Sequence, residues 1–279
     1  MPSFRFYKYH GLGNDYIVLD PREWGMKTLP KAWIRKICDR HRGVGSDGIL
    51  WGPFFEKGNP RLWIYNPDGS EAEKSGNGVR IFSRYLTEKG DVGKNFSLIT
   101  TGGRVEVSRQ ESLETKKSGQ YWFRVQMGQA QFSKKIWAKP EKLLGKQLKF
   151  HYLSIGNPHC VVFLGSADPL NAKFAHRYGP LIENHRLFPK RTNVQFVKIL
   201  SRKKVQIEIW ERGAEYTLAS GSSSCAAVLA AKRQGWVDGS VEVTMPGGKL
   251  WIDVTDDFHA TMLGPVEAAC QGLVTAKLK

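Results

Sequence analysis

The 279-residue sequence predicts an α+β protein of two pseudo-symmetric domains, in each of which a curled, mostly antiparallel sheet surrounds one central helix. Three observations support this fold class. Short segments that alternate apolar and polar residues dominate the chain, which is typical of half-buried strands. Helical patterns are fewer, and one of the two clearest is apolar on every side. Glycine-rich motifs also recur in the two halves of the chain at nearly constant separation.

The strand pattern is clearest at residues 205–210, where the odd positions are apolar and Gln206 and Glu208 lie between them. Because a strand alternates its side chains between two faces, this pattern indicates one buried face and one exposed face. The same alternation predicts strands at residues 4–9, 15–19, 62–65, 105–107, 121–125, 241–243 and 250–254.

Two helices are predicted. Residues 76–89 carry apolar side chains at spacings of three and four, and Gly90 follows as a typical C-terminal residue. Residues 221–234 are apolar all round in their middle and end before Gly235. A helix without a polar face must be enclosed, so we expect it inside a curled sheet with Cys225 in the core.

An internal repeat relates the two halves. Asn14 and Asn157 follow matching glycines with an offset of 143 residues, and Ser75 and Ser220 precede the two helices with an offset of 145. Nearly equal offsets indicate duplicated halves. The boundary is expected after the charged stretch 111–118, and the final strand is expected to return to the first half. The predicted domains are residues 1–120, completed by 266–279, and residues 121–265.

Both helices begin at a glycine that follows a serine. Helix N-termini carry unpaired amides and a positive dipole end, so these two starts are expected to face one cleft and hold a carboxylate. In the plainer interpretation Ser75 and Ser220 are ordinary N-caps. Both interpretations stay open on this evidence alone.

The chain has 42 Lys and Arg against 26 Asp and Glu, a formal charge of +16. Scattered charge favours a solvated basic surface over a groove for DNA or RNA, so no specific nucleic-acid partner is expected. The densest runs lie beside turns or strand ends, at residues 40–42, 116–117, 134–135 and 202–204.

The cysteines and the N-terminus bear on the compartment. Cys38, Cys160, Cys225 and Cys270 stand far apart and form no CxxC pair, which favours reduced thiols over a disulfide framework or a zinc site. The N-terminus has no apolar signal segment, and the longest apolar run, 225–231, is too short to span a bilayer. We expect a cytoplasmic protein with no membrane partner and no metal.

Seven short motifs occur in the order and spacing of the diaminopimelate epimerase family, which the chain resembles from about residue 4 to about residue 265. The resemblance implies two similar domains, each with strands around a central helix. It also implies an isomerase that interconverts LL- and meso-diaminopimelate for lysine biosynthesis with no cofactor, neither PLP nor metal. The motifs are HGLGND at 10–15, NPDGSE at 66–71, SGNG at 75–78, GNPH at 156–159, TN at 192–193, ERG at 211–213 and ASG at 219–221.

The resemblance also implies the roles of individual residues. Glu211 and Arg212 would hold the amino and carboxylate groups of a small amino-acid substrate, and His159 and Glu211 would lie near the proton-transfer pair. Asparagine offers both donors and acceptors, which suits a zwitterion. The asparagines implied in substrate binding are Asn14, Asn66, Asn157 and Asn193, and the backbone amides are those of Gly76, Asn77, Gly221 and Ser222.

The sequence departs from the family at the two cysteines that invert the stereocentre, which are Ser75 and Ser220 here. A thiol ionises near pH 8.5 and lower at a helix N-terminus. A serine hydroxyl stays a weak base unless another group takes its proton. His159 and Glu211 are therefore candidates to activate a serine or to act directly.

Three interpretations remain. The chain is an altered diaminopimelate epimerase, a diverged paralogue that isomerises another amino acid through His159 and Glu211, or an amino-acid-binding protein without catalysis. Lys74 and the serines at 222–224 also depart from the family pattern, which favours natural divergence over a designed replacement of two cysteines. A homodimer is one assembly that the sequence leaves open.

Overall fold

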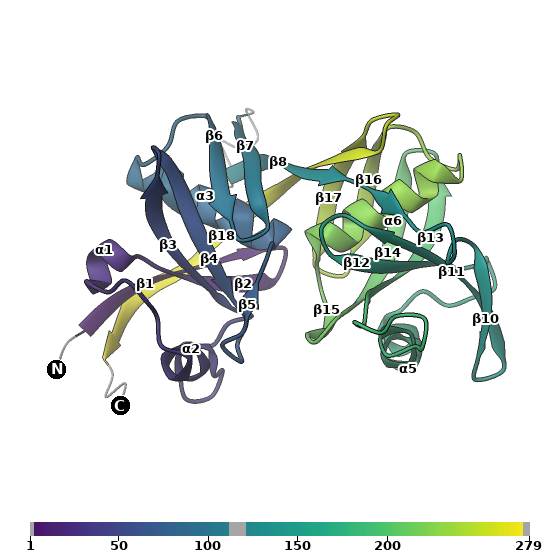
Figure 1. Cartoon of the computed structure of the whole chain (residues 1–279), viewed down its shortest axis with the longest axis horizontal. Coiled ribbons are helices and arrows are strands. Elements are labelled where there is room, and N and C mark those ends of the chain that lie inside the picture. Colours follow the sequence, from purple (N-terminus) through teal and green to yellow (C-terminus); the bar gives the residue numbers. More distant parts are fainter. Residues whose placement is uncertain (1–2, 112–120, 276–279) are drawn as a thin grey trace. The chain divides into compact units, whose positions relative to one another are not determined.

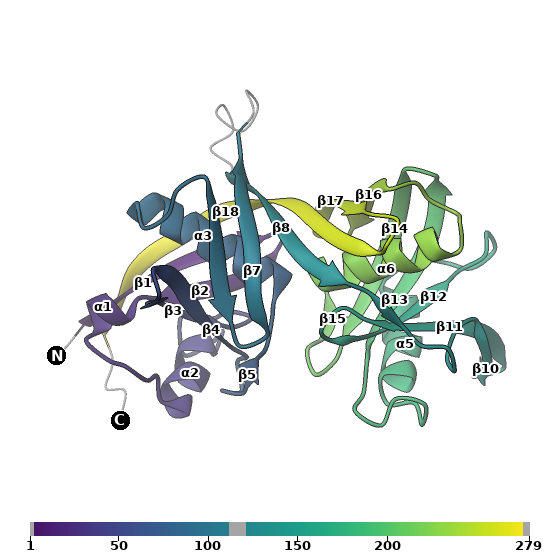
Figure 2. The same cartoon turned by 45° about the horizontal axis from the view of Figure 1, so that its top comes forward.

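The computed structural model describes residues 3–111 and 121–275. The chain divides into two compact units: unit 1 takes the described residues up to Val125 and from Gly264 onward, and unit 2 takes Gln126–Leu263. Two strands, β8 (Tyr121–Gln129) and β18 (His259–Thr275), contribute residues to both units (Figure 2). The predicted boundary at residue 120 and the basic pair 116–117 lie outside the described residues.

The strands of unit 1 besides these two are β1 (Ser3–Gly11), β2 (Asn14–Leu19), β3 (Ile49–Glu56), β4 (Asn59–Tyr65), β5 (Glu71–Ala72), β6 (Asn95–Thr100) and β7 (Gly103–Gln110). Antiparallel pairs β1–β2, β3–β4 and β6–β7 are joined by parallel pairs β2–β3 and β4–β6. β7 pairs with β8, and β18 pairs with both β8 and β1, so the ladder closes on itself.

Helix α3 (Gly76–Lys89) packs against β1, β2 and β3 (Figure 1), and its residues 76–86 are all buried. It begins after the N-cap Ser75 and ends at Gly90, whose φ of 74° is left-handed. The helix predicted at 76–89 is thus confirmed. The short helices α1 (Pro21–Trp24) and α2 (Lys31–Cys38) cover the side of β2 that carries Ile17 and Leu19.

Unit 2 repeats the succession of pairings. Antiparallel pairs β11–β12, β13–β14 and β16–β17 are joined by parallel pairs β12–β13 and β14–β16, and β17 pairs with β18. Its strands besides β8 and β18 are β9 (Gln131–Phe132), β10 (Lys139–Leu143), β11 (Lys146–Ser154), β12 (Pro158–Phe163), β13 (Asn193–Ser201), β14 (Lys204–Glu211), β15 (Glu215–Thr217), β16 (Ser240–Met245) and β17 (Gly248–Val254).

Helix α6 (Gly221–Arg233) contacts β11, β12, β13, β14, β16 and β17 (Figure 1). Its residues 221–231 are buried with the exception of Ser222, and Cys225 lies fully inside the core as predicted. The helix ends one residue before the predicted end at 234, and Gly235 follows with a φ of 74°. An apolar helix without a polar stripe thus packs against strands of its own unit.

Each strand predicted from alternation is present, for example β14, which contains 205–210. Strands β3 and β13 were not predicted, because their first five residues are all buried and show no alternation. No helix in the described parts of the chain is both long and apolar enough to cross a membrane. The described cysteines are free thiols, of which Cys270 alone is exposed.

Helix α5 (Ala172–Glu183), which was not predicted, packs on β13 and β14 through Gly179. A Cβ at Gly179 would lie 2.5 Å from Cγ of Trp210, so only glycine lets the helix approach this ring. Trp210 in turn donates from Nε1 to Glu183 Oε2 at 2.7 Å. The close approach of α5 to β14 thus positions the end of β14, where Glu211 lies.

We expect Gly179→Ala to lower the free energy of unfolding by about 1–3 kcal/mol, because the methyl group overpacks against Trp210. Helix propensity alone would raise stability by about 1 kcal/mol, so a loss identifies the clash. Urea unfolding measures the change. Gly93→Ala is the control, since a Cβ there meets no atom within 4 Å, and equal stability of the two variants would contradict this packing.

Candidate active site

The predicted site residues fall into two sets, one in each unit. Several members of each set lie at or beside the first turn of a buried helix, α3 in unit 1 and α6 in unit 2. Unit 1 holds Asn14, Asn66, Ser75, Gly76 and Asn77, and unit 2 holds Asn157, His159, Asn193, Glu211, Arg212, Ser220, Gly221 and Ser222.

Ser75 is the N-cap of α3. Its Oγ accepts a hydrogen bond from the backbone N–H of Gly78 at 3.0 Å, which satisfies one of the unpaired amides of the first turn. A Cβ at Gly78 would lie 3.2 Å from Cβ of Ser75, so the glycine lets the cap approach closely. The hydroxyl of Tyr16 is a second neighbour, 3.3 Å from Ser75 Oγ.

Asn14 and Asn77 are joined by a hydrogen bond and held from both sides. Asn77 Nδ2 donates to Asn14 Oδ1 at 2.9 Å, and Asn14 Nδ2 donates to Asp47 Oδ2 at 2.7 Å. The fully buried Arg80 donates from Nη2 to Asn77 Oδ1 at 2.8 Å. A Cβ at Gly11 would lie 2.9 Å from this nitrogen, so the first glycine of the predicted motif makes room for Arg80.

Asp47 connects the asparagines to a cluster of charges. Its carboxylate also accepts from the backbone N–H of Asp15 at 3.1 Å, and Arg40 Nη2 lies 2.6 Å from Asp47 and 2.8 Å from Asp15. Burial and the neighbouring Asp15 carboxylate raise the pKa of Asp47. Sequence analysis missed Asp47, because it lies 33 residues from Asn14 in no recognisable motif.

The structure does not bring Asn66 into this network. Asn66 lies in the turn between β4 and β5, where its Nδ2 donates to Ser70 Oγ at 2.9 Å and its backbone N–H donates to Ser70 O at 2.8 Å. These bonds are those of a tight turn residue.

In unit 2, Ser220 is the N-cap of α6, and its Oγ accepts from the backbone N–H of Ser223 at 3.3 Å. A chain of contacts leads from it to the imidazole of His159. Ser220 Oγ lies 3.5 Å from Ser222 Oγ, which accepts from Asn157 Nδ2 at 3.5 Å, and Asn157 Oδ1 lies 2.9 Å from His159 Nε2. The structure therefore brings these four predicted residues together.

His159 is fully buried, and burial lowers its pKa to about 3. The imidazole is therefore neutral near pH 7 and orients Asn157 by a hydrogen bond at Nε2. A general base works best with a pKa near the working pH, so this histidine is a weaker base than a solvated one.

Asn193 fixes the backbone of the turn that carries Arg212. Its Nδ2 donates to Pro158 O at 2.9 Å and its Oδ1 accepts from the backbone N–H of Arg212 at 3.0 Å. The exposed Arg212 side chain donates to Lys190 O at 3.4 Å. Glu211, half-buried, is the last residue of β14.

The buried Glu183 of α5 supports the same turn and was also missed. Its Oε1 accepts from the backbone N–H of Gly213 at 3.0 Å and pairs with Arg191 at 3.0 Å, while Oε2 accepts from Trp210. Gln195 likewise donates to Ser223 Oγ at 3.0 Å below the start of α6. The partners of Glu183 on β14 and in the turn lie 27 and 30 residues away along the chain, so no local sequence pattern predicts these contacts.

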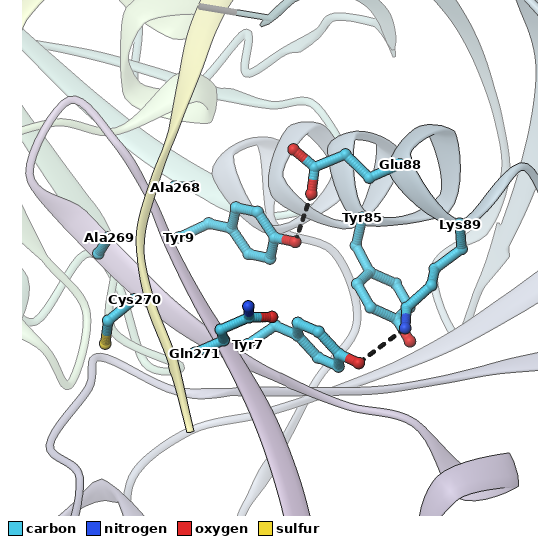
Figure 3. Close-up of a pocket in the computed structure, with 9 residues that line it drawn as sticks. All are labelled: Tyr7, Tyr9, Tyr85, Glu88, Lys89, Ala268, Ala269, Cys270 and Gln271. Atoms are coloured by element: carbon cyan, nitrogen blue, oxygen red, sulfur yellow. Dashed lines mark hydrogen bonds between the residues drawn. The ribbon is translucent and has the colours of Figure 1, made fainter. Parts of the chain in front are cut away.

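A cavity of about 400 Å³ lies at the other end of α3, away from Ser75 (Figure 3). None of the predicted site residues lines it. Four of its polar side chains are paired with one another: Tyr9 donates to Glu88 at 2.7 Å, and Lys89 donates to the hydroxyl of Tyr7 at 2.7 Å. The candidate active site is therefore elsewhere, at the helix N-termini.

Among the described residues, no three or more His, Cys, Asp or Glu side chains are grouped so that they could hold a metal ion.

The fold is that of known racemases and epimerases. A probable proline racemase from Agrobacterium radiobacter is similar over 98% of this chain and 93% of its own, with a TM-score of 0.73 at 14% identity. A hydroxyproline epimerase from Agrobacterium vitis has a TM-score of 0.72 at 14% identity, covering 98% of this chain and 91% of its own. The chain thus has an epimerase fold, mostly sheet with few helices.

Sequence comparison identifies the family. The sequence model of the diaminopimelate epimerase family matches residues 6–133 and 151–269. Diaminopimelate epimerase 2 of Nostoc sp. is 45% identical over 98% of this chain and 96% of its own, and the Carboxydothermus hydrogenoformans diaminopimelate epimerase is 38% identical over 96% and 98%. The chain belongs to the diaminopimelate epimerase family of isomerases.

The burial of His159 predicts a dependence of stability on pH. In the unfolded chain, histidine is protonated below about pH 6.5, whereas in the folded protein His159 stays neutral down to about pH 3. The contribution of neutral His159 to the free energy of unfolding is therefore fully present above pH 6.5. It is lost as the pH falls toward 3, by up to about 1.4 kcal/mol per pH unit.

We expect His159→Gln to remove this component, so that urea unfolding between pH 7 and pH 4 gives a shallower loss of stability in the variant. His259→Gln, which changes an exposed histidine, is the matched control. Identical slopes for wild type and His159→Gln would mean that the imidazole is protonated without cost in the folded protein.

Proposed function

We propose that the protein is a diaminopimelate epimerase in which Ser75 and Ser220 occupy the two proton-transfer positions, converting the LL- to the meso-isomer for lysine biosynthesis without a cofactor. One observation carries the proposal. Each serine caps a buried helix, with its Oγ 3.0 Å from the N–H of Gly78 in one unit and 3.3 Å from that of Ser223 in the other. Membership of the family supports the substrate.

Epimerisation removes the Cα proton on one face and returns a proton to the other, so the proposal requires both serines to act on one Cα. The first-turn amides would stabilise the negative charge that develops in the substrate. The residues proposed to bind the amino and carboxylate groups are Asn14, Asn66, Asn157, Asn193, Glu211 and Arg212, with the amides of Gly76, Asn77, Gly221 and Ser222.

The finer architecture is part of the proposal. The repeated succession of strand pairings supports duplicated halves with pseudo-symmetry, each a curled sheet around a central helix. We take the domains to be residues 1–120 with 266–279 and residues 121–265. A cytoplasmic location and a homodimer stay predictions.

The interpretation in which His159 removes the proton itself has less support, because burial lowers its pKa to about 3. Glu211 remains a candidate acid or base. The interpretation as an amino-acid-binding protein without turnover is separated from catalysis by the first experiment below.

We expect the wild-type protein to exchange the Cα–H of LL- or meso-diaminopimelate for deuterium in D2O, observed by NMR. Exchange reports proton removal even when net inversion is slow. Lysine and glutamate serve as comparison amino acids, because they lack the second stereocentre. Binding of diaminopimelate by calorimetry without any exchange would favour the binding protein.

The double substitution Ser75→Cys with Ser220→Cys should raise epimerisation by about 100-fold or more, because thiols reach a useful thiolate fraction near neutral pH. Each single substitution should do much less, since one face then lacks its thiol. Ser83→Cys with Ser224→Cys adds thiols to the same helices at buried serines that bond helix carbonyls, and should leave activity unchanged. A folded double variant that neither binds diaminopimelate nor exchanges Cα–H would overturn the proposed substrate.

A further inference from the structure

Tyr16 places a phenol beside one of the two serines. Its hydroxyl lies 3.3 Å from Ser75 Oγ, within hydrogen-bond distance, and the residue is 8% exposed. A strand puts alternate residues on the same face, so Asn14 and Tyr16 of β2 both point toward the first turn of α3. Asn14 bonds Asn77 there, and Tyr16 meets Ser75.

The ring of Tyr16 is held in place from behind. A Cβ at Gly48 would lie 2.7 Å from Cε1 of Tyr16 and 2.5 Å from the backbone oxygen of Tyr65, so a glycine is needed for the ring to fit. The backbone N–H of Ile17 donates to Gly48 O at 3.1 Å and fixes β2 against this turn. The phenol therefore approaches Ser75 in a defined geometry.

The geometry points to Tyr16 as the proton-relay and positioning residue for Ser75, an inference that rests on the proposed function. As the substrate Cα–H bond breaks, Ser75 Oγ forms a bond to that proton and gives its own hydroxyl proton to the phenolate oxygen of Tyr16. The electron pair of the C–H bond stays on Cα. Phenolate becomes phenol, Ser75 is unchanged, and the reverse transfer returns the proton.

Two features favour this relay. A serine hydroxyl needs an adjacent base to become reactive, and the hydroxyl of Tyr16 lies 3.3 Å from Ser75 Oγ. The N–H of Gly78 already donates to Ser75 Oγ and would stabilise negative charge on it during the transfer. Ser220 has different surroundings, since its Oγ lies near Ser222 Oγ and the N–H of Ser223.

The first test is the pH dependence of Cα–H exchange of diaminopimelate. With Ser75 present, the rate should rise about tenfold per pH unit between pH 7 and pH 9, while the phenolate fraction is small. In the S75C variant this rise should weaken, because the thiol ionises by itself near pH 8.5. This comparison needs no change at Tyr16 and therefore holds even if a Tyr16 variant fails to fold.

The second test substitutes the phenol. Tyr16→Phe should slow exchange at least about tenfold and flatten the pH profile with Ser75 present, but change the rate less than about threefold in the S75C background. Tyr7→Phe is the matched control, because it removes another buried hydroxyl of unit 1, one that bonds Glu23 and Lys89 instead. An equal loss from Tyr16→Phe in both backgrounds, or no loss in either, would overturn the relay.

A third measurement is independent of turnover. The thiol introduced by S75C is alkylated with iodoacetamide across pH 6–10, with the modified site identified by mass spectrometry to separate it from the exposed Cys270. A phenol that donates to the thiolate favours the charged form, so Tyr16→Phe should raise the alkylation midpoint by about half a pH unit or more.

The outcomes separate the two proposals. Absence of exchange in the wild type together with a shifted midpoint would refute the proposed function but support the contact between Tyr16 and position 75. Exchange in the wild type with an unmoved midpoint and an unchanged Tyr16→Phe rate would refute the relay and leave the epimerase standing.

Discussion

The hydrogen bond from a first-turn amide to a serine hydroxyl, made by Ser75 in one unit and Ser220 in the other, is the interaction on which the candidate site depends. Each helix start is buried, so its unpaired amides must find acceptors within the protein. The serine Oγ that accepts the hydrogen bond from a first-turn backbone N–H is also the atom proposed to transfer the Cα proton of the substrate. Stability of the helix and position of the reactive group are therefore set by one contact.

Around each cap, buried polar side chains fix the neighbours of the serine. Arg80 and Asp47 hold the Asn77–Asn14 pair in unit 1, while His159 and Gln195 hold the groups around the start of α6 in unit 2. Buried polar networks are rigid when their members are paired, because any rotation leaves a group unpaired. The two halves thus share the cap and differ in its surroundings.

Sequence reasoning predicted the parts of this arrangement that local patterns determine. Alternation located β14, spacing located α3, and short motifs located Ser75 and Asn157. Fully buried strands such as β3 escaped, because they show no period. The supporting residues Asp47 and Glu183 were also not predicted. They contact their partners only through tertiary packing, and a single acidic residue in a sequence does not indicate such a contact.

The chain order has a consequence for synthesis. β1 precedes the other described strands along the chain, yet it pairs with β18, so that Tyr7 lies opposite Gln271. All residues of unit 2 leave the ribosome before the part of β18 that pairs with β1, residues 267–275, does. The sheet of unit 2 can thus form while β1 in unit 1 still lacks its partner β18. An unpaired strand edge of this kind makes nascent chains prone to associate.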